Sequence, residues 1–296
     1  MFAVESARRV LRRGLEVVAL LSLILAQGGC AHLRNAAASS LMEDVATATS
    51  RHDDVDLVFQ ALPTYLLLLE GLVEGSPDDA KLRLAAARTY VAYGTVVEME
   101  DPERASRLFE RGMRHGREAL SRNRTVASFL AAPFEEFSHI VEELDSGDLD
   151  LVFWTASNWG AWIKTNLSSM VAVADLPRVI LLMQWVIDED ESYQDGAPHI
   201  FMGIYHAALP PALGGQPDKA LFHFQRAIAL SGEKSLMVFV QMANFYARRV
   251  FDRELYVSLL NRALESPLDG NPDLTLQNTI AKRMARRLLE RVDEFF

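Results

Sequence analysis

Cys30 is the only cysteine in the 296 residues, and its surroundings point to chemistry at its thiol. Four arginines lie between residues 8 and 13, an apolar run spans Leu15–Ala26, and Gln27-Gly28-Gly29 directly precedes the cysteine. Small residues beside a scissile bond suit a signal peptidase, and the thiol of Cys30 could carry a diacylglycerol. The apolar run is shorter than the about 20 residues that cross a bilayer. We therefore expect residues 1–29 to be a lipoprotein signal peptide.

The alternative for Cys30 is an unpaired thiol that follows a signal anchor, and Gln27 stands where lipoprotein sites usually carry Leu. A single cysteine cannot form an internal disulfide, and acylation would remove a thiol that could otherwise pair between molecules. Ala31 occupies the position where an Asp would retain the protein in an inner membrane. We expect an outer-membrane lipid anchor, a body that faces the periplasm, and a tether over residues 30–54.

The charge of the chain excludes nucleic acid as an expected partner. The full sequence has 30 basic and 40 acidic residues, and removal of residues 1–29, with four Arg and two Glu, leaves 26 and 38, a formal charge of −12. Binding to a phosphate backbone uses clustered Lys and Arg, and every basic stretch after the leader is interleaved with acidic or apolar residues at helical spacing. Half of the residues are hydrophobic, which is enough for a substantial core.

Histidines and acids give weak signals for a metal. His199 and His206 are seven residues apart, almost on one helical face, but no third ligand is evident for zinc. The acids of Asp188–Glu191 lack the spacing of a calcium loop, so we expect a solvated helix end. His223, between two phenylalanines, is expected to be packed or capped. We therefore predict no metal site and no cofactor.

Catalytic motifs are also missing from the sequence. It contains no Gly-x-Ser-x-Gly elbow, no Gly-x-Gly-x-x-Gly turn, no phosphate-binding loop and no His-Glu-x-x-His. The single cysteine is assigned to anchoring and does not serve as a nucleophile. We predict that the protein is not an enzyme.

A tryptophan-rich segment is the strongest candidate for ligand contact. Trp154, Trp159 and Trp162 would spread over about 140° of one helix. Gly160 lowers helix stability by about 1 kcal/mol relative to Ala, so we expect a neighbouring helix or an apolar ligand to approach its backbone. Core packing is the simpler role for the rings. Asn158 could orient a carboxylate at the edge of a cleft.

The segments that carry these candidate residues are predicted to be helices. Ser76-Pro77-Asp78, Asp101-Pro102-Glu103 and Asn271-Pro272-Asp273 each place a capping side chain before a proline and an acid, as at helix starts. Two segments, Ala220-x3-Phe224-x2-Ala227 and Ala105-x3-Phe109-x2-Gly112, have the pattern of the second helix of a tetratricopeptide unit. In both cases the connection between this segment and the first helix before it is longer than the consensus unit of about 34 residues allows. We predict an all-α, degenerate tetratricopeptide-like helical-repeat solenoid over residues 55–296, with an irregular all-α domain as the alternative.

Segments in a fixed order along the chain resemble the T-component lipoproteins of TRAP transporters, the tripartite ATP-independent periplasmic systems. The resemblance runs from about Asp54 to Phe296. The segments that carry it are Ala61-Leu62-Pro63, Ser76-Pro77, Leu84-Ala85-Ala86-Ala87, Phe153-Trp154-Thr155-Ala156, Trp159-Gly160-Ala161-Trp162-Ile163, Glu189-Asp190-Glu191-Ser192-Tyr193, Gly196-Ala197-Pro198-His199, Phe222-His223-Phe224-Gln225-Arg226-Ala227 and Arg286-Arg287-Leu288-Leu289. Little is similar between Asn123 and Asp150.

The resemblance implies a helical lipoprotein that associates with the periplasmic solute-binding subunit of a TRAP system. It also implies that protomers could assemble, as trimers, and that a hydrophobic cleft or pore could hold a small apolar or carboxylate ligand. The ligand-cleft candidates are Trp154, Asn158, Trp159, Trp162, Tyr193 and His199. The alternative function is a tetratricopeptide lipoprotein scaffold for assembly of the cell envelope or outer membrane.

Overall fold

The computed structural model describes residues 40–98, 100–208, 215–268 and 270–296, in two compact units. The described part of the first unit (Met1–Asp44), residues 40–44, is helical. The second unit runs from Val45 to Phe296 and contains the whole of the expected domain 55–296. The expected signal peptide and Cys30 lie outside the described residues.

The described part of the chain is all-α and contains no strand, as the sequence predicts. Its α-helices are α2 (Val55–Gly75), α3 (Ala80–Val97), α4 (Pro102–Leu120), α5 (Arg124–Leu130), α6 (Phe134–Phe137), α7 (Ile140–Glu143), α8 (Leu149–Thr165), α9 (Met170–Ala174), α10 (Leu176–Asp190), α11 (Tyr193–Ala207), α12 (Pro217–Ser231), α13 (Met237–Gln241), α14 (Arg253–Glu265) and α15 (Thr275–Glu290). The π-helix η3 (Met242–Ala247) continues α13, and the 3₁₀ turns are η1 (Ser146–Asp148), η4 (Pro272–Leu274) and η5 (Val292–Glu294).

Capping side chains begin several of these helices. Asp101 accepts a hydrogen bond from the Arg104 amide, and α4 begins at Pro102, as predicted. The helix start predicted at Ser76-Pro77-Asp78 is wrong by a few residues, because α3 begins at Ala80. Its cap is Asp79, whose side chain accepts hydrogen bonds from two backbone amides in the first turn of α3. Asn271 caps the short turn η4, and α15 follows it. Side-chain caps satisfy amides that a helix leaves free at its N-terminus, so the local sequence fixes these starts.

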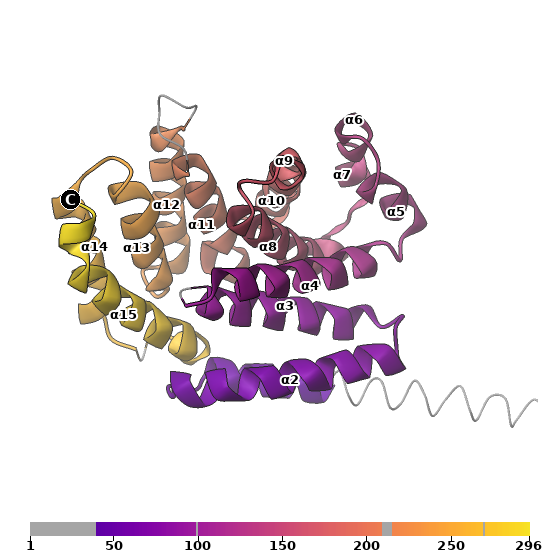
Figure 1. The fold of residues 1–296 in the computed structure, drawn as a ribbon, viewed down its shortest axis with the longest axis horizontal. Helices are drawn as coiled ribbons and strands as arrows, with labels where there is room; N and C mark the ends of the chain where they lie inside the picture. Colours follow the sequence, from indigo (N-terminus) through magenta and orange to yellow (C-terminus); the bar gives the residue numbers. More distant parts are fainter. Residues whose placement is uncertain (1–39, 99, 209–214, 269) are drawn as a thin grey trace, which may run out of the picture. The chain divides into compact units, whose positions relative to one another are not determined.

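Helices that are neighbours in sequence pack on one another through most of the second unit (Figure 1). Helix α3 packs on α4, and α8 packs on both. Then α10 packs on α8, α11 on α10, and α12 on α11. Helices α13 and α14 pack together with η3, and α15 packs on α13 and α14. Helix α2 packs on α3 and also contacts α15, where Arg283 forms a bidentate ion pair with Asp56.

Two helix pairs contain the same aromatic contact. Phe109 of α4 lies against Gly94 of α3, and Phe224 of α12 lies against Gly203 of α11. A Cβ atom at Gly94 or Gly203 would come within 2.5 Å or 3.0 Å, respectively, of the phenylalanine ring. Both phenylalanines are fully buried. The segments around Phe109 and Phe224 therefore contact the preceding helix in the same way.

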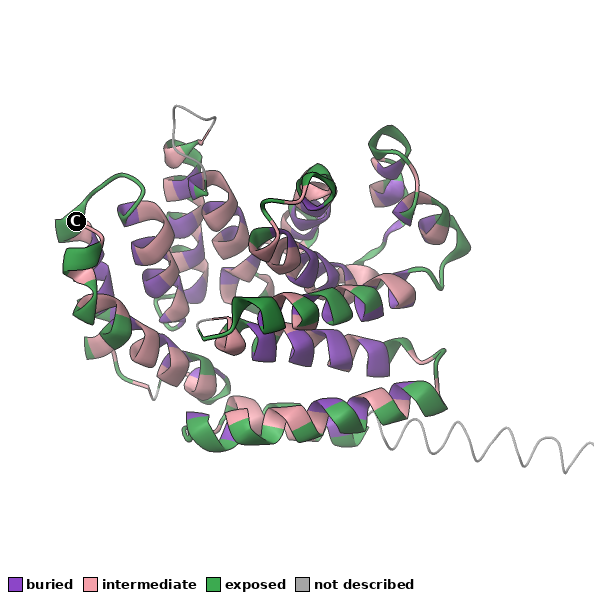
Figure 2. Ribbon diagram, viewed as in Figure 1, coloured by how far each residue is buried: buried purple, intermediate pink, exposed green. Residues whose placement is uncertain are grey.

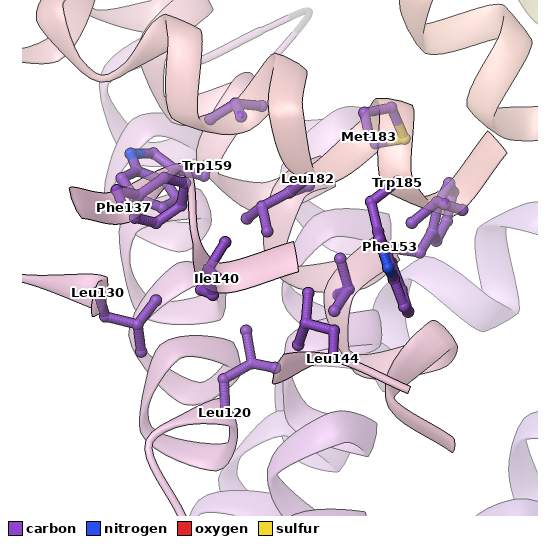
Figure 3. Close-up of a cluster of buried hydrophobic side chains, with 14 of the residues drawn as sticks. Leu120, Leu130, Phe137, Ile140, Leu144, Phe153, Trp159, Leu182, Met183 and Trp185 are labelled. Atoms are coloured by element: carbon purple, nitrogen blue, oxygen red, sulfur yellow. The ribbon is translucent and has the colours of Figure 1, made fainter. Parts of the chain in front are cut away.

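Two groups of buried side chains form the core of the second unit. The first group lies between Leu120 and Met202 and includes Phe137, Trp159 and Met183 (Figure 3). The second group extends from Phe224 to the end of α15 and includes Tyr256, whose burial raises its pKa to about 12. Buried residues lie on the inward faces of the helices, and exposed ones lie outside (Figure 2). The junction of α10 and α11 lies within the sequence range of the first group, after Val186 and before Met202.

Two described stretches, Val55–Gly75 and Met170–Asp190, are long and apolar enough to cross a membrane by length and composition. Helices of a packed core pass the same test. Both stretches here pack on other helices, because α2 lies on α3 while α10 lies on α8 and α11. We therefore assign them to the packed body of the protein.

Candidate functional site

The start of α11, just after its junction with α10, has an unusual backbone. Gln194, Asp195 and Gly196 follow one another with φ angles of 50°, 57° and 82°, all in the left-handed region. A left-handed conformation costs a non-glycine residue roughly 1–2 kcal/mol. Such conformations persist only where the surroundings hold them, and they concentrate at functional sites. We call residues 191–199 the elbow and take it as the candidate functional site.

The glycine of the elbow is required by its surroundings as well as by its φ angle. A Cβ atom on Gly196 would lie 3.2 Å from the Cα atom of Ala227 and 3.2 Å from the Cβ atom of Leu230, both on α12. Pro198 then lies two residues beyond the left-handed segment, in the first regular turn of α11, where its missing N–H has no helical partner to lose. The elbow is thus pressed against α12.

On one side, the elbow is bound to α8 and α3 through Asp150. The hydroxyl of Tyr193 donates to one oxygen of Asp150, and Arg88 Nη2 donates to the other at 2.6 Å. The Arg88 guanidinium also lies 5.6 Å from the centre of the Trp154 ring. Burial and the bond to Asp150 raise the pKa of Tyr193 well above its usual range. Tyr193 is therefore a neutral donor at physiological pH.

Aromatic rings surround this polar group. Phe153 packs edge-on against Tyr193 and against Trp154, with ring centres 4.9 Å apart in both pairs. Trp154 and Tyr193 are only partly buried, whereas Phe153 is 5% exposed. The arrangement presents partly exposed aromatic surface beside the Arg88 cation.

On the other side, the elbow is bound to α12 by a carboxylate and two histidines. Glu191 accepts two hydrogen bonds from the Arg226 guanidinium, one of them at 2.9 Å from Nε. The Nε2 atom of His199 lies 3.5 Å from a Glu191 oxygen. The Nδ1 atom of His199 lies 2.8 Å from Nδ1 of His223, which is a hydrogen-bonding distance. These contacts join the end of α10, the start of α11 and the middle of α12.

A third histidine and a phenylalanine complete this cluster. The ring of His206 stacks on His223 with centres 5.4 Å apart and an angle of 12° between planes. Phe222 packs edge-on against His199 and His223 and is 59% exposed. Burial lowers the pKa of all three histidines, and that of His223 falls to about 4 because the two other histidines add to the effect. The rings are therefore neutral at neutral pH.

Three of the six residues predicted as ligand-cleft candidates lie in or beside the elbow, on two different sides of it. Trp154 and Tyr193 lie on its α8 side, and His199 lies on its α12 side. Asn158 and Trp159 are buried inside the body at 0% and 1% exposure, and Trp162 is partly buried against the same core as Trp159.

The two buried candidates take part in packing within the body, and Asn158 also bonds to its own helix. Asn158 donates hydrogen bonds to the carbonyl oxygens of Ala87 and Trp154, each at 2.9 Å. The ring of Trp159 packs edge-on against Phe137, with Arg117 4.8 Å from its centre. The approach predicted at Gly160 is confirmed, and the approaching group is the ring of Phe201 on α11.

The sequence alone does not assign partners to either half of the elbow. Nothing in its local pattern marks Arg88, Asp150 or Arg226 as elbow contacts, and the pattern around His223 predicts only a packed or capped ring. His223 stands 24 residues from His199, so only the facing of α11 and α12 reveals the contact. Among the described residues, no group of three or more His, Cys, Asp or Glu is arranged to hold a metal ion.

Comparison with known proteins decides the family. A model of the TRAP transporter T-component family matches residues 51–296, which include every helix described above from α2 onward. The chain belongs to the TRAP transporter T-component family. An uncharacterised protein of Treponema pallidum (strain Nichols) is 25% identical to this T-component over 275 residues, covering 86% of this chain and 84% of that protein.

Membership of this family indicates the general role of the protein. The family is an accessory of TRAP transport, it is associated with the periplasm and cell envelope, and it is generally not enzymatic. The elbow and both of its polar groups lie within the matched range. The elbow is therefore part of a transport accessory protein.

Proposed function

We propose that this T-component is a periplasm-facing lipoprotein that binds the periplasmic solute-receptor subunit of a TRAP system. The observation that carries the proposal is the family match over residues 51–296. The acidic charge of the chain, formally −10 at pH 7, favours a protein partner over nucleic acid. Lipidation of Cys30 would hold the body beside the outer membrane.

A repeat architecture is part of this proposal. The shared contact of Phe109 on Gly94 and of Phe224 on Gly203 supports two tetratricopeptide-like units, α3–α4 and α11–α12. Stacked helix pairs form extended concave surfaces, and proteins built from them commonly bind other proteins. This geometry suits an adaptor better than a catalyst.

The α8 side of the elbow is the proposed contact for a small apolar or carboxylate ligand. Trp154 and Tyr193 supply partly exposed aromatic surface. The side chain of Arg88 is 35% exposed, and its unpartnered Nε atom is buried. The exposed part of a guanidinium can bind a carboxylate through N–H groups other than the one that Asp150 accepts. Aromatic rings beside such a cation suit a ligand with an apolar body and an acidic end.

Photo-crosslinking in intact cells tests the partner. Met170 on α9 and Leu67 on α2 are 84% and 75% exposed, and each belongs to a group of exposed apolar side chains of the kind that marks partner surfaces. A photoreactive amino acid would replace each residue in turn, with Glu142, whose side chain is 69% exposed, as the matched polar control. We expect a crosslink to the solute-receptor subunit from one apolar position and none from Glu142. Crosslinks only to outer-membrane assembly factors would instead support the scaffold function.

Mass spectrometry and membrane fractionation test the anchor. The protein purified from membranes should begin at a lipidated Cys30, and a Cys30→Ser variant should lose the lipid and leave the outer-membrane fraction. Binding of the receptor subunit should survive in this variant, because the proposed partner contacts lie in the helical body. A mature N-terminus elsewhere would refute the anchor and leave the partner proposal standing.

A further inference from the structure

The three histidines between α11 and α12 form a cluster that the transport role does not use. His199 and His223 face each other through their Nδ1 atoms at 2.8 Å, and His206 stacks on His223. A hydrogen bond between two ring nitrogens needs one proton between them, so one ring donates and the other accepts. Glu191, 3.5 Å from Nε2 of His199, favours the tautomer of His199 with a proton on Nε2. His223 is then the donor at Nδ1.

This pair can hold one extra proton but not two. If His199 becomes cationic, His223 can move its own proton to Nε2 and accept from His199 at Nδ1. If both rings are cationic, two N–H groups face each other at 2.8 Å and the hydrogen bond is lost. Two adjacent positive charges in a partly buried site also repel each other strongly. Full protonation therefore breaks this hydrogen bond between α11 and α12.

The charged groups around His199 and His223 make their hydrogen bond more sensitive to protonation. Lys219 and Arg226 of α12 and His206 of α11 disfavour positive charge on the histidines, whereas Glu191 at the end of α10 favours it. Arg249, which follows η3, donates to the carbonyls of Ala207 and Ala208 at the far end of α11. We interpret the cluster as a site that binds protons, because the described residues offer no set of three ligands for a metal.

The same contacts hold the elbow in its strained form. Gln194, Asp195 and Gly196 are all left-handed, and they lie between Glu191 and His199, the two elbow residues bound to α12. We propose that His199 and His223 form a proton-sensitive clasp between α11 and α12, which holds this left-handed segment at neutral pH and releases it when both rings are protonated. The inference concerns regulation of the fold and does not depend on the proposed transport partner.

Hydrogen exchange of the full-length protein tests the clasp. Exchange rates of the elbow peptide, residues 190–200, would be measured between pH 6.5 and pH 4 and divided by the intrinsic rate at each pH. One unit of pKa difference is a tenfold change in an equilibrium constant, so we expect at least a roughly tenfold loss of protection in the elbow. The peptide from α4 serves as an internal control and should keep its protection.

Variants separate the clasp from general acid unfolding. His206→Gln leaves the His199–His223 pair in place but removes a group that is charged in acid. The loss of elbow protection, which we call the step, should therefore move to higher pH. His223→Gln should expose the elbow already at pH 7 and abolish the step. The exposed His139→Gln is the matched control and should behave as the wild type. If His223→Gln does not fold, His206→Gln still decides the matter. Constant elbow protection down to pH 4, or an unmoved step in His206→Gln, would overturn the proposal.

Discussion

Replacement of Gly112 by alanine tests the close packing of α4 against α8. A Cβ atom at Gly112 would lie 2.0 Å from Oδ1 and 2.5 Å from Cγ of Asn158, whose side chain is fully buried. The amide must move, and it would lose its hydrogen bonds to Ala87 and Trp154. Overpacking costs roughly 1–3 kcal/mol, and displaced buried polar groups cost about 1–3 kcal/mol more. The higher helix propensity of alanine returns about 1 kcal/mol.

We therefore expect Gly112→Ala to lower the free energy of unfolding by about 1–5 kcal/mol in urea titrations followed by tryptophan fluorescence. Gly71→Ala is the matched control, because a Cβ atom at this exposed position of α2 meets nothing within 4 Å. It should stabilise the protein by up to about 1 kcal/mol. In the double variant Gly112→Ala with Asn158→Ala, the loss should be smaller than the sum of the two single losses. Equal stability of Gly112→Ala and Gly71→Ala would refute the packing described for α4 and α8.

Three further outcomes are expected. Gly196→Ala should lower the thermal midpoint and reduce stability by about 1–3 kcal/mol, because its φ of 82° is left-handed and its new Cβ would lie 3.2 Å from Ala227; an unchanged midpoint would contradict this. His223 has a pKa of about 4 in the folded state against an ordinary 6.5, so the unfolded chain takes up the proton first and stability should fall as the pH drops from 6.5 to 4. The ring is partly exposed, so the loss should be roughly 1–2 kcal/mol, and a flat urea profile in this window would count against it. Arg283→Gln, which removes the exposed ion pair with Asp56, should lower the midpoint slightly in low salt and not in high salt; a salt-independent loss would point to another role.

Local signals in the sequence predict the helices well. Asp101 and Pro102 begin a helix by satisfying free amides with a side chain and by fixing φ, and both effects are encoded within a few residues. The repeated pattern around Phe109 and Phe224 identifies the inward faces of α4 and α12, and both phenylalanines are buried. The error at Ser76 has the same local origin, because Asp79 offers a competing cap three residues later.

The site could be predicted only in part. Trp154, Tyr193 and His199 stand out by residue type and family resemblance, but their partners come from helices distant in sequence. Asp150 is 43 residues from Tyr193, and the left-handed conformation of Gln194 has no marker in the local sequence beyond the nearby glycine. Tertiary contacts hold these features, so propensity and periodicity do not reveal them.

A calorimetric titration of two purified proteins measures whether this T-component binds the solute-receptor subunit of a TRAP system. The mature lipoprotein in detergent would be titrated with the receptor subunit from the same organism. We expect saturable binding with a Kd of about 1 μM or tighter, which corresponds to roughly −8 kcal/mol, and co-elution of the two proteins. No heat of binding and no co-elution at about 100 μM of each protein would contradict it.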